Sequence, residues 1–476
     1  MARKTWIPTL LLVVLVACAT NPATGRSNFN TMSEADEIAL GKQADAQVRQ
    51  EMGVYIDAAW QSYVNRIGQT LAKKSHRPSL PWSFAVVDAP AVNAFALPGG
   101  YIYLTRGILP FLRDEAELAN VLGHEIAHVT ARHGAQAYSK QQAGGLLVGL
   151  GRIFAPERYQ GALGVAEAGV GLLFLKHGRD AEREADQFGV GYAAGSGWDP
   201  AGMTGMLATL GRLSEASGSR RGVPNFLSTH PAPEDRIAEL STTVAAAAGA
   251  GSRTTNATEF SRRLDGLVFG DSREQGMVRG RDFIHPILRF SLRFPENWEI
   301  ANGAEQVVAK PEGEAQAALL LQVVADASRP PADVARAVMA QNKMTARSGS
   351  ETTINGLRAY VGTFSGEGQV VEAAFIASGG QTYLLAGLAT EASFTSARRV
   401  FEDTIGSFRP ISQQEADAIQ PDRVDSYTVR NGDTWAAIAQ DVSKGAIGPA
   451  SLAVMNGSAP GSRPAPGARI RVVVRR

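Results

Sequence analysis

The sequence predicts a multidomain α+β protein, and three observations support that class. The chain has 476 residues, and a domain usually has about 150, so we expect about three domains. Helical periodicity dominates the first half, whereas strand-like runs dominate the second, which is typical of α+β architecture. Two polar stretches of small and turn-forming residues, 246–258 and 411–424, are expected to be linkers between domains.

Composition excludes several classes of protein. Hydrophobic residues make up 44% of the chain and charged residues 20%, so the chain is neither disordered nor fibrous. The 47 Lys and Arg residues against 46 Asp and Glu leave a net charge of +1, and we therefore expect no nucleic-acid partner. A single cysteine excludes an intrachain disulfide and a Cys-based zinc cluster. The chemistry must come from histidines and carboxylates.

Residues 1–18, MARKTWIPTLLLVVLVAC, have the pattern of a bacterial export signal. Basic residues precede an apolar run that is too short to span the roughly 30 Å hydrocarbon core of a bilayer. The run ends in Leu-Val-Ala-Cys, which resembles the lipobox of bacterial lipoproteins. We therefore expect a lipid anchor at Cys18 and a tether over residues 19–32. Ala19, rather than Asp, after the cysteine favours the periplasmic face of the outer membrane, and an ordinary signal peptide is the alternative.

The first domain, residues 33–245, is expected to be mainly helical with a small sheet. Ser33, followed three residues later by Asp36, is an N-cap signal that begins the first helix. Further helical or strand-like patterns follow in the order helix 56–74, strands 82–88 and 101–105, and helical segments over 114–139 and 180–195. The Gly- and Leu-rich segment 143–175 carries charged residues along its length, which favours a helix pair or a flap over a membrane span.

The segment ELANVLGHEIAHVTARH, residues 117–133, carries the chemistry. His124 and His128 are four residues apart, so on a helix both imidazoles can bind one metal ion. Glu125 projects about 100° away from His124, where it can take a proton from a water on the metal. Two imidazoles and a carboxylate suit zinc and leave a fourth position for that water. The alternative is a pair of structural histidines on a helix face.

A third ligand must come from elsewhere in the chain. The metzincin pattern needs Gly at position 131 and His at position 134, where this chain has Ala131 and Gly134, so that pattern is excluded. In the later segment DAEREAD, Glu182 and Asp186 are four residues apart. A ligand Glu could therefore share a helix face with an Asp that orients an imidazole. Glu184 lies on a different face, and a solvated helix surface is the alternative for each of these acids.

HEIAH followed by EREAD resembles the HExxH and ExxxD motifs of the zinc metallopeptidase family that includes the CAAX prenyl protease, HtpX, Oma and BepA-like proteases. NAFALPGGYI, residues 93–102, is similar to that family's strand and turn beside the cleft. STHP, residues 228–231, together with Arg236, is similar to its downstream His-Pro motif. The resemblance covers roughly 33–245 and implies a zincin-type metalloprotease domain.

The resemblance also implies roles for individual residues. One zinc ion per chain would be bound by His124, His128 and Glu182, with Glu125 as general base and acid, and Asp186 and Arg236 would support the ligands. His230 would lie opposite the zinc, where it stabilises the oxyanion or binds the metal and caps a resting enzyme; a plain loop histidine is the alternative. An extended substrate would contact Asn93, Phe95, Gly99, Gly100 and Tyr101, although core packing is an equal alternative for the aromatic residues. His133 is interpreted as a helix-terminal histidine.

Two further domains are expected beyond residue 258. Residues 259–410 predict an α+β domain that is similar to the PsbP-like fold, a resemblance that carries no function. Residues 425–476 predict a small βααβ domain that resembles the LysM peptidoglycan-binding module in YTVRNGDTWAAIA and PGARIRV. That resemblance implies glycan binding through the loops after the first strand and before the last, and a packing domain without glycan binding is the alternative.

These patterns together indicate a zinc-dependent endopeptidase anchored in the bacterial envelope. Its expected substrates are misfolded or unassembled envelope proteins. One alternative is a lipid-anchored scaffold or chaperone that binds peptidoglycan through the LysM-like module. The other is a zinc-dependent peptidoglycan hydrolase, since such enzymes also carry LysM modules.

Overall fold

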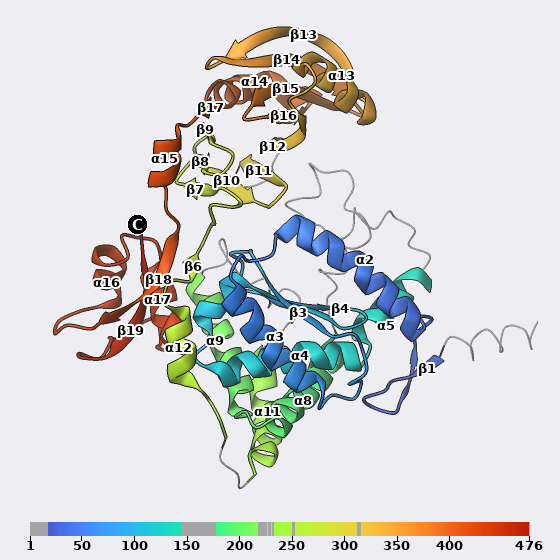
Figure 1. Ribbon diagram of the computed structural model, residues 1–476, viewed down its shortest axis with the longest axis vertical. Helices are drawn as coiled ribbons and strands as arrows, with labels where there is room; N and C mark the ends of the chain where they lie inside the picture. The colour runs from blue at the N-terminus through green and yellow to red at the C-terminus, as the bar shows by residue number, and fades with distance from the viewer. Residues whose placement is uncertain are drawn as a thin grey trace, which may run out of the picture. The chain divides into compact units, whose positions relative to one another are not determined.

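The computed structural model describes residues 18–143, 178–217, 226, 230, 233–249, 253–311 and 316–475. It has two compact units, whose elements are labelled in Figure 1. Of these residues, unit 1 contains those up to Gly270 and those from Asp422 to Arg475, and unit 2 contains those from Asp271 to Pro421. The predicted export signal, apart from Cys18, and the helix pair or flap predicted for 143–175, apart from Ala143, lie outside the described residues. No helix in the described part is long and apolar enough to cross a membrane.

Unit 1 begins with a hairpin that is held against the domain. β1 (Cys18–Thr20) pairs antiparallel with β2 (Ser27–Phe29). Directly after β1, the buried Asn21 side chain donates from Nδ2 to the carbonyl oxygen of Ala131 at 3.1 Å. Residues 19–32, predicted to be a tether, are therefore folded onto the domain rather than extended away from it.

Helices surround a three-stranded sheet in the next part of unit 1. The sheet has the order β3 (Ser83–Val87), β5 (Tyr101–Thr105) and β4 (Ala94–Leu97), with β3 parallel and β4 antiparallel to β5. The predicted cap at Ser33 is confirmed, because Ser33 and Asp36 form a capping box. The helices are α2 (Glu34–Met52), α3 (Ala58–Ala72), η1 (Arg106–Phe111, a 3₁₀-helix), α4 (Glu115–Thr130), α5 (His133–Ala143), α8 (Arg179–Gly195), α9 (Ala201–Ser217), α11 (Pro233–Ala248) and α12 (Ala257–Leu264).

Helix α4 lies at the centre of this part, and every one of its residues is buried. Its apolar side chains join a core cluster with residues of α3, β3, β5, α8 and α9. A buried helix that also carries polar side chains must supply each of them with a partner. The polar side chains of α4 are therefore informative about function, and they are Glu115, Glu117, Asn120, His124, Glu125, His128 and Thr130.

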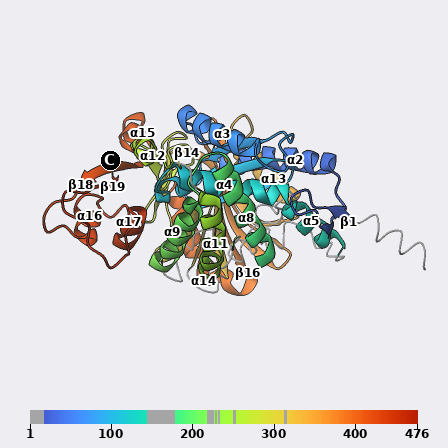
Figure 2. The same cartoon turned by 90° about the horizontal axis from the view of Figure 1, so that it is seen from below.

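The C-terminal module, residues 422–475, packs within unit 1. Its elements follow the predicted βααβ order: β18 (Asp422–Thr428), α16 (Trp435–Asp441), α17 (Pro449–Met455) and β19 (Arg469–Val474). β18 pairs with β19 and also with β6 (Val268–Phe269). Its apolar side chains share a cluster with Phe111 and Leu213, and α17 lies beside α9 (Figure 2). The guanidinium of Arg471 donates to the carbonyl oxygens of Pro110, Leu112 and Arg113.

Unit 2 is an insertion in unit 1, because the chain leaves at Gly270 and returns at Asp422, which pairs directly with Phe269. Its main sheet is antiparallel, in the order β10 (Trp298–Asn302), β11 (Gln306–Pro311), β12 (Ala317–Asp326), β16 (Gln381–Thr390), β15 (Gln369–Ser378), β14 (Leu357–Gly366) and β13 (Thr345–Ile354). A smaller sheet has the order β17 (Arg409–Pro410), β9 (Phe290–Arg293), β8 (Asp282–His285) and β7 (Met277–Arg279). The helices are α13 (Pro331–Gln341), α14 (Glu391–Gly406) and α15 (Gln413–Ala418).

The main sheet of unit 2 buries both of its faces at its centre, although nine of the ten residues of the edge strand β13 are exposed. Along β15, Ala374 and Ile376 join one apolar cluster, whereas Ala373 and Phe375 join another. This alternation follows from the two-residue period of a strand. The unit is α+β, as the sequence predicts for residues 259–410. It begins later than predicted, because α12 and β6 pack in unit 1.

Candidate metal centre

His124, His128, Glu182 and His230 converge inside unit 1. One donor atom from each side chain lies within 4.8 Å of every other donor. His124 and His128 lie one turn apart on α4, and Glu182 lies in the first turn of α8. All four residues are at most 3% exposed. The structure therefore brings together the three predicted ligands and His230.

The spacing of these donors fits a tetrahedral zinc site. With bonds of about 2.0–2.1 Å to zinc, tetrahedral ligands lie about 3.4 Å from one another. The Nε2 atoms of His124 and His128 are 3.0 Å apart, and they lie 3.6 and 3.5 Å from the Glu182 carboxylate oxygens. His230 Nδ1 lies 3.3 Å from His124 Nε2 and 3.0 Å from Glu182 Oε1. The donor set of imidazole nitrogen and carboxylate oxygen is also the one that zinc favours.

Asp186 and Arg236 hold two of the predicted ligands, His124 and Glu182, in position. Asp186 Oδ1 lies 3.0 Å from Nδ1 of His124, so the other ring nitrogen, Nε2, faces the other donors. Arg236 forms a forked pair with Asp186 at 2.8 and 2.6 Å and reaches Glu182 Oε2 at 2.9 Å. One guanidinium therefore orients the Glu182 and Asp186 carboxylates, as the planar fork of arginine allows.

Electrostatics keep these two carboxylates ionised. Burial alone would raise the pKa of Glu182, but the neighbouring His230, His124 and Arg236 outweigh it and hold that pKa well below the usual range. Burial likewise opposes ionisation of Asp186, and hydrogen bonds from His124 and Arg236 bring its pKa below the usual value. A carboxylate must be deprotonated to bind a metal ion, so the site is prepared for a cation.

Glu125 lies beside the cluster and faces His230. It is 1% exposed, and its Oε1 lies 3.7 Å from Nε2 of His230. Oε1 has no hydrogen-bond partner among the described residues. Burial raises the pKa of Glu125, although His230 and His124 oppose this shift. A buried carboxyl with a raised pKa suits proton transfer near neutral pH.

His133 and Glu184, neither of which was predicted to support a ligand, lie next to His128. Nδ1 of His133 lies 3.0 Å from Nδ1 of His128, and Nε2 of His133 lies 3.3 Å from Oε2 of Glu184. The hydrogen bond with His133 lowers the pKa of Glu184. His133 thus contacts a predicted ligand and is more than a helix-terminal residue.

The predicted substrate residues lie along β4 and the turn that follows it. β4 is an edge strand of its sheet within the described chain, and a cavity of about 20 Å³ separates its end, residues 96–98, from His128. The ring of Phe95 is buried and stacked on Tyr103 at 5.0 Å, so core packing accounts for that side chain. Backbone groups of β4 remain candidates for pairing with a substrate.

The other predicted substrate residues hold the sheet together. The Asn93 amide donates to Thr105 Oγ1 at 2.9 Å, and Asn93 Oδ1 accepts from the amide of Ala94. Gly99 and Gly100 form the turn between β4 and β5 with φ of 81° and 105°, a conformation that favours glycine. Tyr101 is half-buried at the start of β5. Direct substrate contacts of these residues stay predictions.

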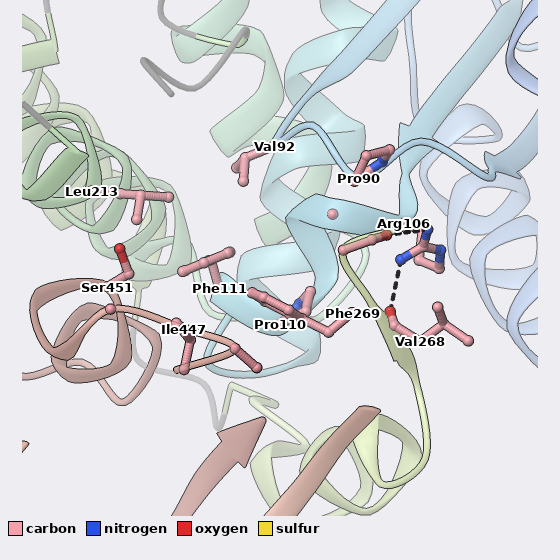
Figure 3. Close-up of a pocket in the computed structure, with 14 residues that line it drawn as sticks. Pro90, Val92, Arg106, Pro110, Phe111, Leu213, Val268, Phe269, Ile447 and Ser451 are labelled. Carbon is pink, nitrogen blue, oxygen red and sulfur yellow. Dashed lines mark hydrogen bonds between the residues drawn. The ribbon is translucent and has the colours of Figure 1, made fainter. Parts of the chain in front are cut away.

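A larger cavity of about 290 Å³ lies elsewhere in unit 1, between η1, β6 and residues 446–451 of the C-terminal module (Figure 3). Its lining is mainly apolar and contains none of the clustered donors. Arg106 borders it, but its guanidinium is paired with Asp88 and donates to the carbonyl oxygens of Val268 and Gly270. The cavity therefore offers no free charged group for a ligand.

A family model described as peptidase family M48 matches residues 58–244, which include all four clustered donors. This part of the chain is therefore similar to peptidase family M48, and residues 58–244 are called the M48 domain below. The beta-barrel assembly-enhancing protease of Escherichia coli (strain K12) is 32% identical to this chain over 227 residues, which are 46% of each chain. The mitochondrial metalloendopeptidase OMA1 of Schizosaccharomyces pombe is 32% identical over 222 residues, 46% of this chain and 64% of the relative. The chain spans about half the length of the bacterial relative.

These matches agree with the resemblance and with the metal that it implies. M48 enzymes use zinc, and the four donors of the M48 domain are positioned to hold one ion. Among solved structures, cyanobacterial PsbP from Synechocystis sp. PCC 6803 is 13% identical, with a TM-score of 0.24, over 28% of this chain and 95% of that protein.

Proposed function

We propose that the M48 domain is a zinc-dependent endopeptidase. The observation that carries the proposal is the set of four buried donors at tetrahedral spacing with the Glu125 carboxyl beside it. His124, His128 and Glu182 would hold the zinc ion. When bound, zinc supplies a Lewis acid that polarises a peptide carbonyl and makes water a nucleophile near neutral pH.

Glu125 would move the proton in this reaction. Its carboxylate takes a proton from the attacking water at Oε1 and then delivers it to the nitrogen of the leaving amine. The buried position and the absence of a hydrogen-bond partner for Oε1 among the described residues support this role. Arg236 and Asp186 would keep Glu182 and His124 in place throughout the cycle.

His230 would close the site between rounds of catalysis. Its Nδ1 lies at a fourth donor position, and a zinc ion with four protein ligands has no place for water. The ring stacks on Phe226 at 4.3 Å, which supports this position. Turnover would then require His230 to move away. The alternative role of its imidazole is stabilisation of the oxyanion.

An extended polypeptide is the proposed substrate. The edge of β4 that pairs with no other described strand runs beside His128, and adding a substrate strand to it would place a peptide bond near the donors. We infer that the substrates are misfolded or unassembled proteins of the bacterial envelope. The lipobox-like sequence at Cys18 and the name of the bacterial relative, beta-barrel assembly-enhancing protease, support that inference. The proposed location is the periplasmic face of the outer membrane.

Substitution of Glu125 tests the enzymatic proposal. Glu125→Gln should still bind one zinc ion per chain but lose cleavage of an unfolded protein such as casein by at least about 1,000-fold. Glu239→Gln is the matched control, because Glu239 is half-exposed, is paired with Arg183 and is not one of the four clustered donors. A Glu125→Gln protein that cuts casein at the native rate would refute the assignment.

A second function is favoured by the βααβ order of the C-terminal module. We propose that the module binds N-acetylglucosamine-containing glycan through the exposed loops 430–433 and 459–463. Co-sedimentation with purified sacculi tests this. Digestion of the sacculi would instead indicate a peptidoglycan hydrolase. Absence of zinc from the purified chain would indicate a scaffold or chaperone.

A further inference from the structure

On the side of its ring that points away from the other donors, His128 contacts a short series of polar groups. Its Nε2 faces the other donors, 3.0 Å from Nε2 of His124. Its Nδ1 lies 3.0 Å from Nδ1 of His133, and Nε2 of His133 lies 3.3 Å from the Glu184 carboxylate. The two rings are 5.0 Å apart at 73°, so they meet through their nitrogen atoms rather than by stacking. We call His128, His133 and Glu184 the relay.

A sharp turn of the backbone creates this contact. In a continuous helix, residues 128 and 133 would point about 140° apart. Instead α4 ends at Thr130 and Arg132 takes φ +61°, after which His133 begins α5. Left-handed φ is costly for a residue other than glycine. The Arg132 side chain is tied to Glu37 and to the carbonyl oxygen of Met32, which stabilises the turn.

The relay has one consistent arrangement of protons. A histidine that binds metal through Nε2 carries its proton on Nδ1. His128 would then donate from Nδ1 to an unprotonated Nδ1 of His133. His133 would carry its own proton on Nε2 and donate it to Glu184. Each hydrogen bond fixes the tautomer of the next ring. Because the ionised Glu184 carboxylate can only accept, both N–H donors of the relay point toward it.

We propose that His133 and Glu184 are positioning residues that hold His128 in the tautomer and orientation that bind zinc. This inference rests on the proposed function. The two imidazoles of α4 would then be supported differently, His124 directly by the Asp186 carboxylate and His128 through the His133 ring. Outer partners of this kind raise metal affinity by about 10–100-fold.

Substitution of Glu184 is the most direct test of this proposal, because α8 also carries Asp180, an acid that can serve as the matched control. The Glu184 side chain is 27% exposed, so its removal should leave the fold intact. In the full-length chain, Glu184→Ala should weaken zinc binding by about 10-fold or more in competition with a chromogenic chelator. Asp180→Ala in the same helix should bind zinc like the native chain, because Asp180 is 98% exposed and contacts Arg183.

Two substitutions of His133 distinguish the effect of its Nδ1 acceptor from the effect of the size of its ring. His133→Phe keeps a ring but removes the acceptor, and should weaken zinc binding by about 10–100-fold. His133→Asn places an amide oxygen where Nδ1 accepts, and should restore much of the affinity. The absorption spectrum of the cobalt-loaded protein, which reports the geometry of the ligands, should change in His133→Phe and return towards native in His133→Asn.

The outcomes distinguish this inference from the proposed function. If the native chain binds no zinc, both fail. If the native chain, Glu184→Ala and Asp180→Ala bind zinc equally, the relay is overturned while the peptidase proposal stands. If His133→Phe does not fold, which circular dichroism would show, the pair Glu184→Ala and Asp180→Ala decides the question alone.

Discussion

Gly123 of α4 and Gly189 of α8 lie backbone to backbone. A Cβ atom on Gly123 would lie 2.8 Å from the carbonyl oxygen of Gly189, and one on Gly189 would lie 2.8 Å from the amide nitrogen of His124. Glu182, Asp186 and Gly189 occupy one face of α8 by their spacing of four and three residues. The close approach of the helices therefore sets how near Glu182 comes to the histidines of α4.

Gly189→Ala should push α8 away from α4. Overpacking of this kind costs about 1–3 kcal/mol, and we expect weaker zinc binding because Glu182 moves with the helix. Gly191→Ala is the matched control, since a Cβ there has no neighbour within 4 Å, and it should stabilise the chain by about 0.4–1 kcal/mol. Thermal unfolding and zinc titration of both variants check this. Equal zinc affinity in the two would contradict it.

Arg236→Lys should weaken zinc binding by at least about 10-fold, because lysine keeps the charge but cannot hold Asp186 and Glu182 together. Arg183→Lys should have little effect, because the Arg183–Glu239 pair is half-exposed and such pairs contribute less than about 1 kcal/mol. Chelator competition measures both. Native affinity in Arg236→Lys would show that the carboxylates need no forked partner.

His230→Ala should keep one zinc ion per chain and cleave casein faster than the native protein. The reason is that His124, His128 and Glu182 still bind the metal while the fourth donor position becomes free for water. Metal analysis and initial rates test this. A fall in rate of about 100–1,000-fold with zinc retained would instead assign His230 to oxyanion stabilisation.

Arg471→Leu should loosen the C-terminal module. The guanidinium donates to three backbone carbonyl oxygens, and burial lowers its pKa to about 10, so it stays charged at neutral pH. Its loss should cost about 2–4 kcal/mol in urea unfolding. Arg469→Leu, two residues earlier on β19, is the control with a side chain that is 71% exposed. Similar losses in both variants would contradict this role for Arg471.

Unit 2 should lose stability as the pH falls from about 6.5 to 4. Burial lowers the pKa of His285 to about 4, whereas an unfolded histidine titrates near 6.5. Between these values the unfolded chain binds a proton that folded His285 does not, so acid favours unfolding by up to about 3 kcal/mol. Hydrogen exchange of β8 and β9 against pH measures this. His285→Gln should flatten the dependence, and an unchanged profile would exclude His285 as its source.

Local signals predicted the parts of the fold that depend on neighbours in sequence. The cap of α2 follows from Ser33 and Asp36, which satisfy each other's backbone amides. The spacing of His124 and His128 likewise placed two donors together before any tertiary structure was known. Choosing Glu182 over Glu184 as the third donor needed the family resemblance, because helix spacing alone left other interpretations open.

Other features depend on contacts that a sequence pattern does not contain. His133 could not be paired with His128, because a left-handed Arg132 is not expected from its residue type. The packing of the C-terminal module in unit 1 depends on Arg471, which meets carbonyl oxygens about 360 residues earlier in the chain. The predicted domain boundary at residues 411–424 therefore separated the C-terminal module from the rest of unit 1, with which it packs.

The hydrogen bond from Asn21 to Ala131 limits how far the peptidase could stand from a membrane. If Cys18 carries a lipid, only Ala19 and Thr20 lie between it and Asn21, and three residues reach at most about 10 Å. Ala131 follows His128 by three residues, so the active centre would then lie close to the lipid headgroups.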